Sequence, residues 1–192
     1  MTSSWQAERR DRILAAARAA LEEQDYESIQ MRDVAQRAGV ALGTLYRCFT
    51  SKEHLYAAVL SDWARRSAVA ARRDLPSPEA RVRARVHGVI TAYQRQPQFY
   101  KAHVTLQSSS DPNARALLTE FGRAARASLA AEVAVLGPVP ADDAATMLWA
   151  LITSRLTQAI YRGGDVEEIH RIADEFVDLL VPRLRGEQAD DG

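Results

Sequence analysis

The chain has 192 residues, a formal net charge of zero and one cysteine. This length suffices for one or two domains with a buried core, and a single cysteine excludes an internal disulfide. No apolar stretch approaches the roughly 20 residues that span a membrane, and the N-terminus lacks a signal-peptide core, so we expect a cytoplasmic protein with no membrane partner. Glycine and proline are few, which predicts an all-α fold.

The first predicted helix covers residues 7–24. Its apolar residues recur at helical spacing and are Ile13, Ala16, Ala17, Ala20 and Leu21. Three arginines gather on its N-terminal side, namely Arg9, Arg10 and Arg12. They form either a solvated helix face or an arm that contacts a nucleic-acid backbone or minor groove, and both interpretations stay open.

Two short helices around a tight turn are predicted next, at residues 31–38 and 42–49. Gly39 ends the first of them, because glycine adopts a positive φ without a Cβ penalty. The second buries Leu45 and Phe49 in this interpretation. Two short helices joined by a three- to four-residue turn that contains glycine match the DNA-binding helix-turn-helix, whose second helix enters a major groove.

The outward side chains of the second helix carry groups that suit phosphate oxygens. Thr44 and Tyr46 supply hydroxyls, Arg47 lies on the same face, and Lys52 adds an ammonium just beyond. Ser51 occupies the N-cap position of the next helix, whose free N–H groups could hold a phosphate. Each side chain alone could instead be a packing or solvated residue, but the combination predicts binding to double-stranded DNA.

This segment resembles the DNA-binding domain of the TetR family of bacterial regulators over roughly residues 9–60. The residues that carry the resemblance are MRDVA at 31–35, AGV at 38–40, GTLY at 43–46, Phe49 and SKE at 51–53. Within this family, the sequence of residues 30–55 looks most similar to actinobacterial regulators of steroid and cholesterol catabolism. That closer similarity is less specific, because related DNA-binding domains occur in regulators of unrelated ligands. We use it only as an indication of the ligand.

The resemblance also implies roles for individual residues. It implies phosphate contacts from Thr44, Tyr46 and Lys52. It implies base-edge or groove contacts from Arg32 and from the tip of the second helix, Ala41, Leu42 and Gly43. Three positions depart from the family pattern: Asp25 replaces a glycine, Gln30 replaces a Ser or Thr cap, and Cys48 replaces a His or Tyr.

Six more helices follow, which makes about nine in all. They are predicted at residues 52–73, 78–96, 97–107, 112–136, 142–161 and 165–184. The first of these is long enough to connect a DNA-binding domain with a second domain, and Leu75-Pro-Ser-Pro marks a break behind it. Pro138 and Pro140 are expected to bar helix continuation. We predict a DNA-binding domain at residues 1–55 and a ligand-sensing and dimerisation domain at residues 56–192.

The central part of the chain carries aromatic residues with a few polar groups, a composition that suits a small-molecule pocket between helices. The candidates are Trp63, Tyr93, Phe99, Tyr100, His103, Gln107 and Phe121. Any one of them could instead be an ordinary core residue. If they line a pocket, the effector is a bulky apolar molecule, and the resemblance leans toward a steroid or an acyl-CoA.

The last two predicted helices each carry a wide apolar face. Such a pair either completes one core or forms a four-helix bundle with a second copy, and the two-fold symmetry of helix-turn-helix proteins on DNA favours a homodimer. The residues predicted at this interface are Leu148, Ile152, Leu156, Ile160, Ile172, Phe176 and Leu179.

The chain lacks the motifs of common catalytic and metal sites. There is no HExxH, no CxxC, no glycine-rich phosphate loop and no Gly-x-Ser-x-Gly elbow, so we expect no catalytic residue, metal or cofactor. The function predicted is that of a ligand-responsive repressor that binds a pseudo-palindromic operator as a dimer. The competing class is a helical interaction protein in which the helix-turn-helix only packs.

Overall fold

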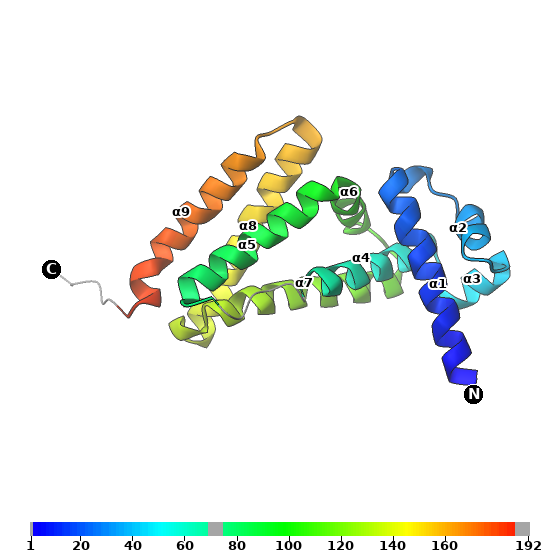
Figure 1. Ribbon diagram of the computed structural model, residues 1–192, viewed down its shortest axis with the longest axis horizontal. Coiled ribbons are helices and arrows are strands. Elements are labelled where there is room, and N and C mark those ends of the chain that lie inside the picture. Colours follow the sequence, from blue (N-terminus) through cyan, green and yellow to red (C-terminus); the bar gives the residue numbers. More distant parts are fainter. Residues whose placement is uncertain (1, 69–74, 187–192) are drawn as a thin grey trace. The chain divides into compact units, whose positions relative to one another are not determined.

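The computed structural model describes residues 2–68 and 75–186, which form nine α-helices and two short 3-10 helices without a strand (Figure 1). The all-α class predicted from the sequence is therefore confirmed. The elements in chain order are α1 (Thr2–Glu23), η1 (Tyr26–Ser28), α2 (Met31–Arg37), α3 (Leu42–Cys48), α4 (Lys52–Ala68), α5 (Pro78–Arg95), α6 (Pro97–Leu106), α7 (Pro112–Glu132), η2 (Ala134–Leu136), α8 (Pro138–Arg162) and α9 (Val166–Leu184).

The described residues fall into two compact units, and neither is one continuous stretch of chain. The first unit comprises Met1–Arg66 together with Gln96–Phe121, and the second comprises Ser67–Arg95 together with Gly122–Gly192. Most of α4, all of α6 and the start of α7 therefore pack with the helix-turn-helix. The compact units follow a boundary that differs from the functional boundary predicted between residues 55 and 56, which stays a prediction.

The core of the first unit forms where the apolar stripe of α1 meets the two short helices and α4. Ile13 and Leu21 of α1 are fully buried, as are Leu45 of α3 and Phe49 behind it. Tyr56 of α4 is also fully buried, and its hydroxyl donates to the Ala17 carbonyl at 3.3 Å. Burial of these side chains supplies the main stabilisation, at about 1.5–3 kcal/mol for each large apolar group.

Several element ends differ from the sequence-based prediction. The last part of the predicted helix 112–136 is the separate 3-10 turn η2, and α8 begins at Pro138 instead of after Pro140. Prolines are tolerated there because the first N–H groups of a helix have no intrahelical acceptor. Gly137 makes the turn possible with φ of 91°. The predicted end of helix 52–73 lies outside the described residues.

In the second unit, α5, α8 and α9 pack against one another, as the green, yellow and orange helices of Figure 1 show. Val86 and Ile90 of α5, Ile152 of α8 and Val177 of α9 are buried there. Asp165 caps α9, because its carboxylate accepts the Glu167 N–H at 2.9 Å. None of the helices described is long and apolar enough to cross a membrane.

Candidate nucleic-acid interface

The turn between α2 and α3 has the geometry that a helix-turn-helix requires. Gly39 has φ of 66°, and its N–H donates to the Gln36 carbonyl at 3.1 Å while Val40 N–H donates to the Ala35 carbonyl at 3.0 Å. This pair of bonds is the Schellman motif, which satisfies the last carbonyls of a helix. A Cβ on Gly39 would meet no atom within 4 Å, so the backbone angle alone requires glycine.

The helix α3 turns one face inward and leaves the opposite face to solvent. Leu45 is fully buried and anchors the helix, whereas Tyr46 is 44% exposed and Arg47 is exposed. Leu42 is exposed at the N-terminal tip of α3, and Thr44 is half-buried. This division of α3 into a buried and an open face agrees with the pattern predicted from the sequence.

Two of the polar residues predicted to contact phosphates already have partners within the chain. The Thr44 hydroxyl accepts a hydrogen bond from Arg47 Nη2 at 2.8 Å. Lys52 Nζ donates to the Glu27 carbonyl at 3.2 Å and lies 4.4 Å from the centre of the Tyr26 ring. Desolvation by burial lowers the pKa of Lys52. Its ammonium has three donors, so donors remain for a phosphate beside the bond to Glu27.

The base-reading candidate Arg32 lies at the start of α2. Its side chain is exposed and has no ion-pair partner among the residues that the structure describes. Neighbouring Gln30 is the N-cap of α2 but makes no side-chain capping bond. Asp25, which replaces a family glycine, has φ of −63°, so the chain there needs no left-handed residue.

The arginines near the N-terminus are not equivalent. Arg10 packs its guanidinium over the Phe49 ring at 4.3 Å, and its Nη1 donates to the Cys48 carbonyl at 3.5 Å. Arg9 stacks on the Trp5 ring at 3.5 Å. Arg12 is exposed. Of the two interpretations left open by the sequence, Arg10 therefore fits neither, because it joins α1 to the end of α3.

The capping role predicted for Ser51 is confirmed at the start of α4. The Ser51 hydroxyl accepts the His54 N–H at 2.9 Å. The residue before it, Thr50, donates its own N–H to His54 Nδ1 at 3.2 Å. Desolvation by burial, followed by the charge of Arg10, lowers the pKa of His54.

The predicted ligand-binding residues divide between the two units. Trp63 lies against Phe99 with ring centres 5.3 Å apart, and His103 lies 5.0 Å from Phe121 and 6.2 Å from Tyr100. All of these residues belong to the first unit. Tyr93 is buried in α5, in the second unit, and its place in a ligand site stays a prediction.

His103 is the buried polar residue of this aromatic group. Its side chain is 4% exposed, and its ring nitrogen Nε2 lies 2.8 Å from the amide nitrogen Nε2 of Gln107. Burial lowers the pKa of His103 to about 4, so the ring is neutral at pH 7. Gln107 itself is exposed at the end of α6.

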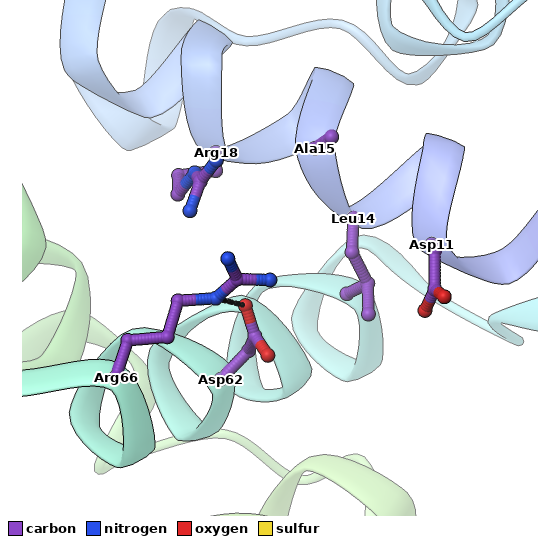
Figure 2. Close-up of a pocket in the computed structure, with 6 residues that line it drawn as sticks. All are labelled: Asp11, Leu14, Ala15, Arg18, Asp62 and Arg66. Carbon is purple, nitrogen blue, oxygen red and sulfur yellow. Dashed lines mark hydrogen bonds and ion pairs between the residues drawn. The ribbon is translucent and has the colours of Figure 1, made fainter. Parts of the chain in front are cut away.

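A small pocket lies elsewhere in the first unit, between α1 and α4. It has a volume of about 40 Å³ and is lined by Asp11, Leu14, Ala15, Arg18, Asp62 and Arg66. Figure 2 shows the Arg18 and Arg66 side chains extending toward it from the two helices. Arg66 Nε pairs with Asp62 at 2.7 Å. Sequence reasoning missed this pocket, since nothing in the spacing of these charges marks it.

Three residues predicted at a dimer interface are buried within a single chain. Leu148, Ile152 and Leu156 are at most 2% exposed within a single chain, because they face α5 and α9 in the core of the second unit. The predicted residues Ile160, Ile172 and Phe176 are half-buried, and Leu179 is 77% exposed. Met147 and Tyr161 are further exposed apolar residues of α8 that the sequence-based set omitted.

The comparisons with known proteins bear on the class of protein. The family model described as bacterial regulatory proteins of the tetR family matches residues 13–59. The HTH-type transcriptional regulator BetI of Burkholderia thailandensis is 31% identical over 185 residues, which cover 90% of this chain and 93% of BetI. A crystal structure of a TetR transcriptional regulator from Rhodococcus sp. RHA1 has a TM-score of 0.79 at 27% identity and covers 92% of this chain and 97% of that one.

The chain belongs to the TetR family of transcriptional regulators. The HTH-type transcriptional repressor KstR of Rhodococcus jostii is 36% identical over 126 residues, which cover 64% of this chain. The matched part spans 58% of that relative, and only 28% of the KstR of Mycolicibacterium smegmatis. Because the matching family and relatives are transcriptional regulators, the expectation that the chain is not an enzyme is confirmed. Among the described residues, no group of three or more His, Cys, Asp or Glu side chains could hold a metal.

Proposed function

We propose that this chain is a ligand-responsive transcriptional repressor that binds a pseudo-palindromic operator as a homodimer and is released by a small apolar effector. The observation that carries the proposal is the division of α3 into two faces. Leu45 anchors the helix in the core, while Leu42, Tyr46 and Arg47 stay open to solvent. A bacterial regulator of this kind works where the chromosome lies, so the cytoplasm is its proposed location.

The proposed division of labour separates phosphate contacts from base contacts. Tyr46, Thr44 and Lys52 hold phosphates and fix the position of α3, whereas Arg32 contacts a base edge. The tip of α3, Ala41 to Gly43, offers no side-chain hydrogen-bond donor. Leu42 then contributes by contact with a thymine methyl group and through the shape of the groove.

The proposed effector site is the aromatic group of the first unit around His103. The support is its composition: the rings of Tyr100 and Phe121 lie against one neutral imidazole, and Trp63 packs against Phe99 in the same unit. Rings favour a bulky apolar ligand, and the resemblance in sequence leans toward a steroid or an acyl-CoA. Because the rings are packed, a ligand must displace some of them, and this displacement is what alters the DNA-binding helices.

The proposed dimer interface is the outward face of α8 and α9. Leu179 is its most exposed apolar residue, and Met147 and Tyr161 are exposed on α8. The half-buried Ile160, Ile172 and Phe176 complete the apolar set. A four-helix bundle with a second copy would bury these side chains and set the spacing of the two copies of α3.

The first test is recovery and sequencing of genomic DNA bound to the protein in its native host. We expect enrichment of one motif with two inverted half-sites separated by about one helical turn. The enriched motif is then measured by fluorescence anisotropy with wild type, Tyr46→Ala and Val135→Ala. Val135 is an exposed apolar residue of η2 in the second unit, outside α8 and α9, and serves as the control. Equal binding to the motif and to random duplex would contradict the proposal.

The second test concerns the effector. Steroids and acyl-CoA molecules are titrated against the protein–operator complex of wild type, Phe121→Ala and Tyr93→Ala. We expect at least one compound to release wild type, and to release Phe121→Ala only at a changed concentration. Unchanged concentrations for both variants would place the effector site outside the proposed residues.

A further inference from the structure

Residues from the start of α7 contact the point at which α3 ends. Asn113 Nδ2 donates to the Thr50 hydroxyl at 3.1 Å, although 63 positions separate the two residues. Both residues lie in the first compact unit and both are exposed. The contact is therefore a direct polar connection between a central helix and the turn that joins α3 to α4.

A capping bond holds the start of α7. The Asp111 carboxylate accepts the Ala114 N–H at 2.8 Å and so caps α7. This capping bond lowers the pKa of Asp111. Asn113 therefore lies in the first turn of a capped helix, beside Thr50 of the α3–α4 turn.

Thr50 is also held from its other side. Its N–H donates to His54 Nδ1 at 3.2 Å, and its hydroxyl lies 3.2 Å from the same nitrogen. Because Nδ1 accepts the N–H, the imidazole carries its proton on Nε2. The His54 ring in turn packs edge-on against Phe49 with ring centres 5.3 Å apart. Thr50 therefore lies between Asn113 of α7 and His54 of α4.

These contacts act on the end of α3 that matters for its orientation. Phe49 is the C-cap of α3 and is fully buried, so α3 is anchored there and at Leu45. The helix has seven residues and is about 10 Å long. A small rotation of α3 about its C-terminal end therefore displaces its N-terminal tip, where the proposed groove contacts lie.

We propose that Asn113 is a positioning residue for α3, which holds its C-terminal end through Thr50 and thereby sets the affinity for the operator without contacting DNA. This inference rests on the proposed function. It places a determinant of DNA binding outside residues 9–60, the segment that carries the resemblance to the family. Removal of one such neutral hydrogen bond is expected to weaken operator binding about 3- to 10-fold.

The test is a double-mutant cycle on the Thr50–Asn113 contact. Thr50→Val and Asn113→Ala are expected to lose operator affinity to a similar extent, and the double variant to lose no more than either one. Thr50→Ser keeps the hydroxyl and should retain wild-type affinity. Ser110→Ala is the matched control, because Ser110 is an exposed neighbour with no bonding partner among the described residues. The dependence of affinity on salt should be unchanged in all variants, since no phosphate contact is removed.

Two outcomes would overturn the proposal. If Thr50→Val loses affinity and Asn113→Ala does not, Thr50 contacts DNA directly and α7 plays no part. If the two losses simply add, the residues act separately. Amide hydrogen exchange over residues 42–51 supplies a readout that needs no DNA, and we expect faster exchange in Asn113→Ala than in Ser110→Ala. Should the wild type bind no specific duplex, the proposed function fails while the exchange measurement still decides whether α7 holds α3.

Discussion

At the scale of single residues, the two classes of DNA contact should be separable by mutation. Tyr46→Phe removes only a hydroxyl, so we expect weaker binding to all duplexes to about the same extent. Arg32→Ala should instead relax sequence preference, at a cost of about 1–3 kcal/mol if the contact is to a guanine edge. Anisotropy titrations with operator and random duplex measure both. Equal losses on the two duplexes for the Arg32 variant would refute the assignment.

Lys52 makes contacts within the chain as well as lying at a predicted phosphate-binding position. Its ammonium already bonds to the Glu27 carbonyl and lies over the Tyr26 ring. Lys52→Ala therefore removes an internal contact as well as a possible phosphate contact. If the phosphate contact exists, the plot of log affinity against log salt loses roughly one unit of slope. A variant with weaker binding and an unchanged slope would show that Lys52 only supports η1.

The buried imidazole predicts a specific dependence of stability on pH. The pKa of His103 is about 4 in the folded chain, below its ordinary value of about 6.5. Between these values the unfolded chain binds a proton that the folded chain does not, so the free energy of unfolding falls as the pH is lowered through this window. The loss approaches about 3 kcal/mol at pH 4 and is absent above pH 7.

The comparison that isolates this effect uses His103→Gln, which cannot titrate. Urea unfolding followed by circular dichroism is measured for both proteins from pH 7 to pH 4 at one protein concentration. Carboxylates contribute equally to both, so the difference between the two curves belongs to the imidazole. Parallel curves would mean that His103 becomes protonated in the folded chain as easily as in the unfolded one.

At the scale of elements, the α2–α3 turn depends on one backbone angle. Gly39 has φ of 66°, and a Cβ there would touch nothing, so Gly39→Ala should cost only the left-handed backbone penalty of about 1–2 kcal/mol. Gly43 lies inside α3 with a negative φ and open space around it. Gly43→Ala should therefore be neutral or stabilise by up to about 1 kcal/mol.

The pair of glycine variants separates stability from DNA binding. Thermal unfolding reports the first property and operator anisotropy reports the second. Because Gly43 is at the proposed groove-facing tip, an added methyl group should weaken operator binding even though the fold gains stability. Tighter or equal binding by Gly43→Ala would argue that the tip of α3 does not approach the DNA closely.

At the scale of the whole molecule, burial within one chain decides which mutation tests the proposed dimer interface. Leu156 is 1% exposed inside the second unit, so Leu156→Glu should unfold the subunit and tells nothing about assembly. Leu179 is 77% exposed, so Leu179→Glu should leave the subunit folded and yield monomers. Sedimentation velocity measures the mass, and Val135→Glu is the control on another exposed apolar residue. An intact dimer of Leu179→Glu would move the interface to another surface.

The sequence by itself determined the fold class, the family and most helix positions, because these depend on local signals. The glycine at position 39 and the capping Ser51 each act on neighbouring residues, and the structure confirms both. The apolar spacing of α3 also predicted its buried and open faces correctly. Each of these features is set by residues within about five positions of one another.

Only the tertiary structure decided which apolar faces were already used and which polar groups had found partners. The stripe of Leu148, Ile152 and Leu156 looked available for a second copy, but α5 covers it together with α9. Lys52 looked free for phosphate, but its ammonium donates a hydrogen bond to the Glu27 carbonyl, 25 positions earlier. The bond from Asn113 to Thr50 spans 63 positions. Periodicity reports that a helix has an apolar face and never what covers it, because that depends on contacts between segments far apart in the chain.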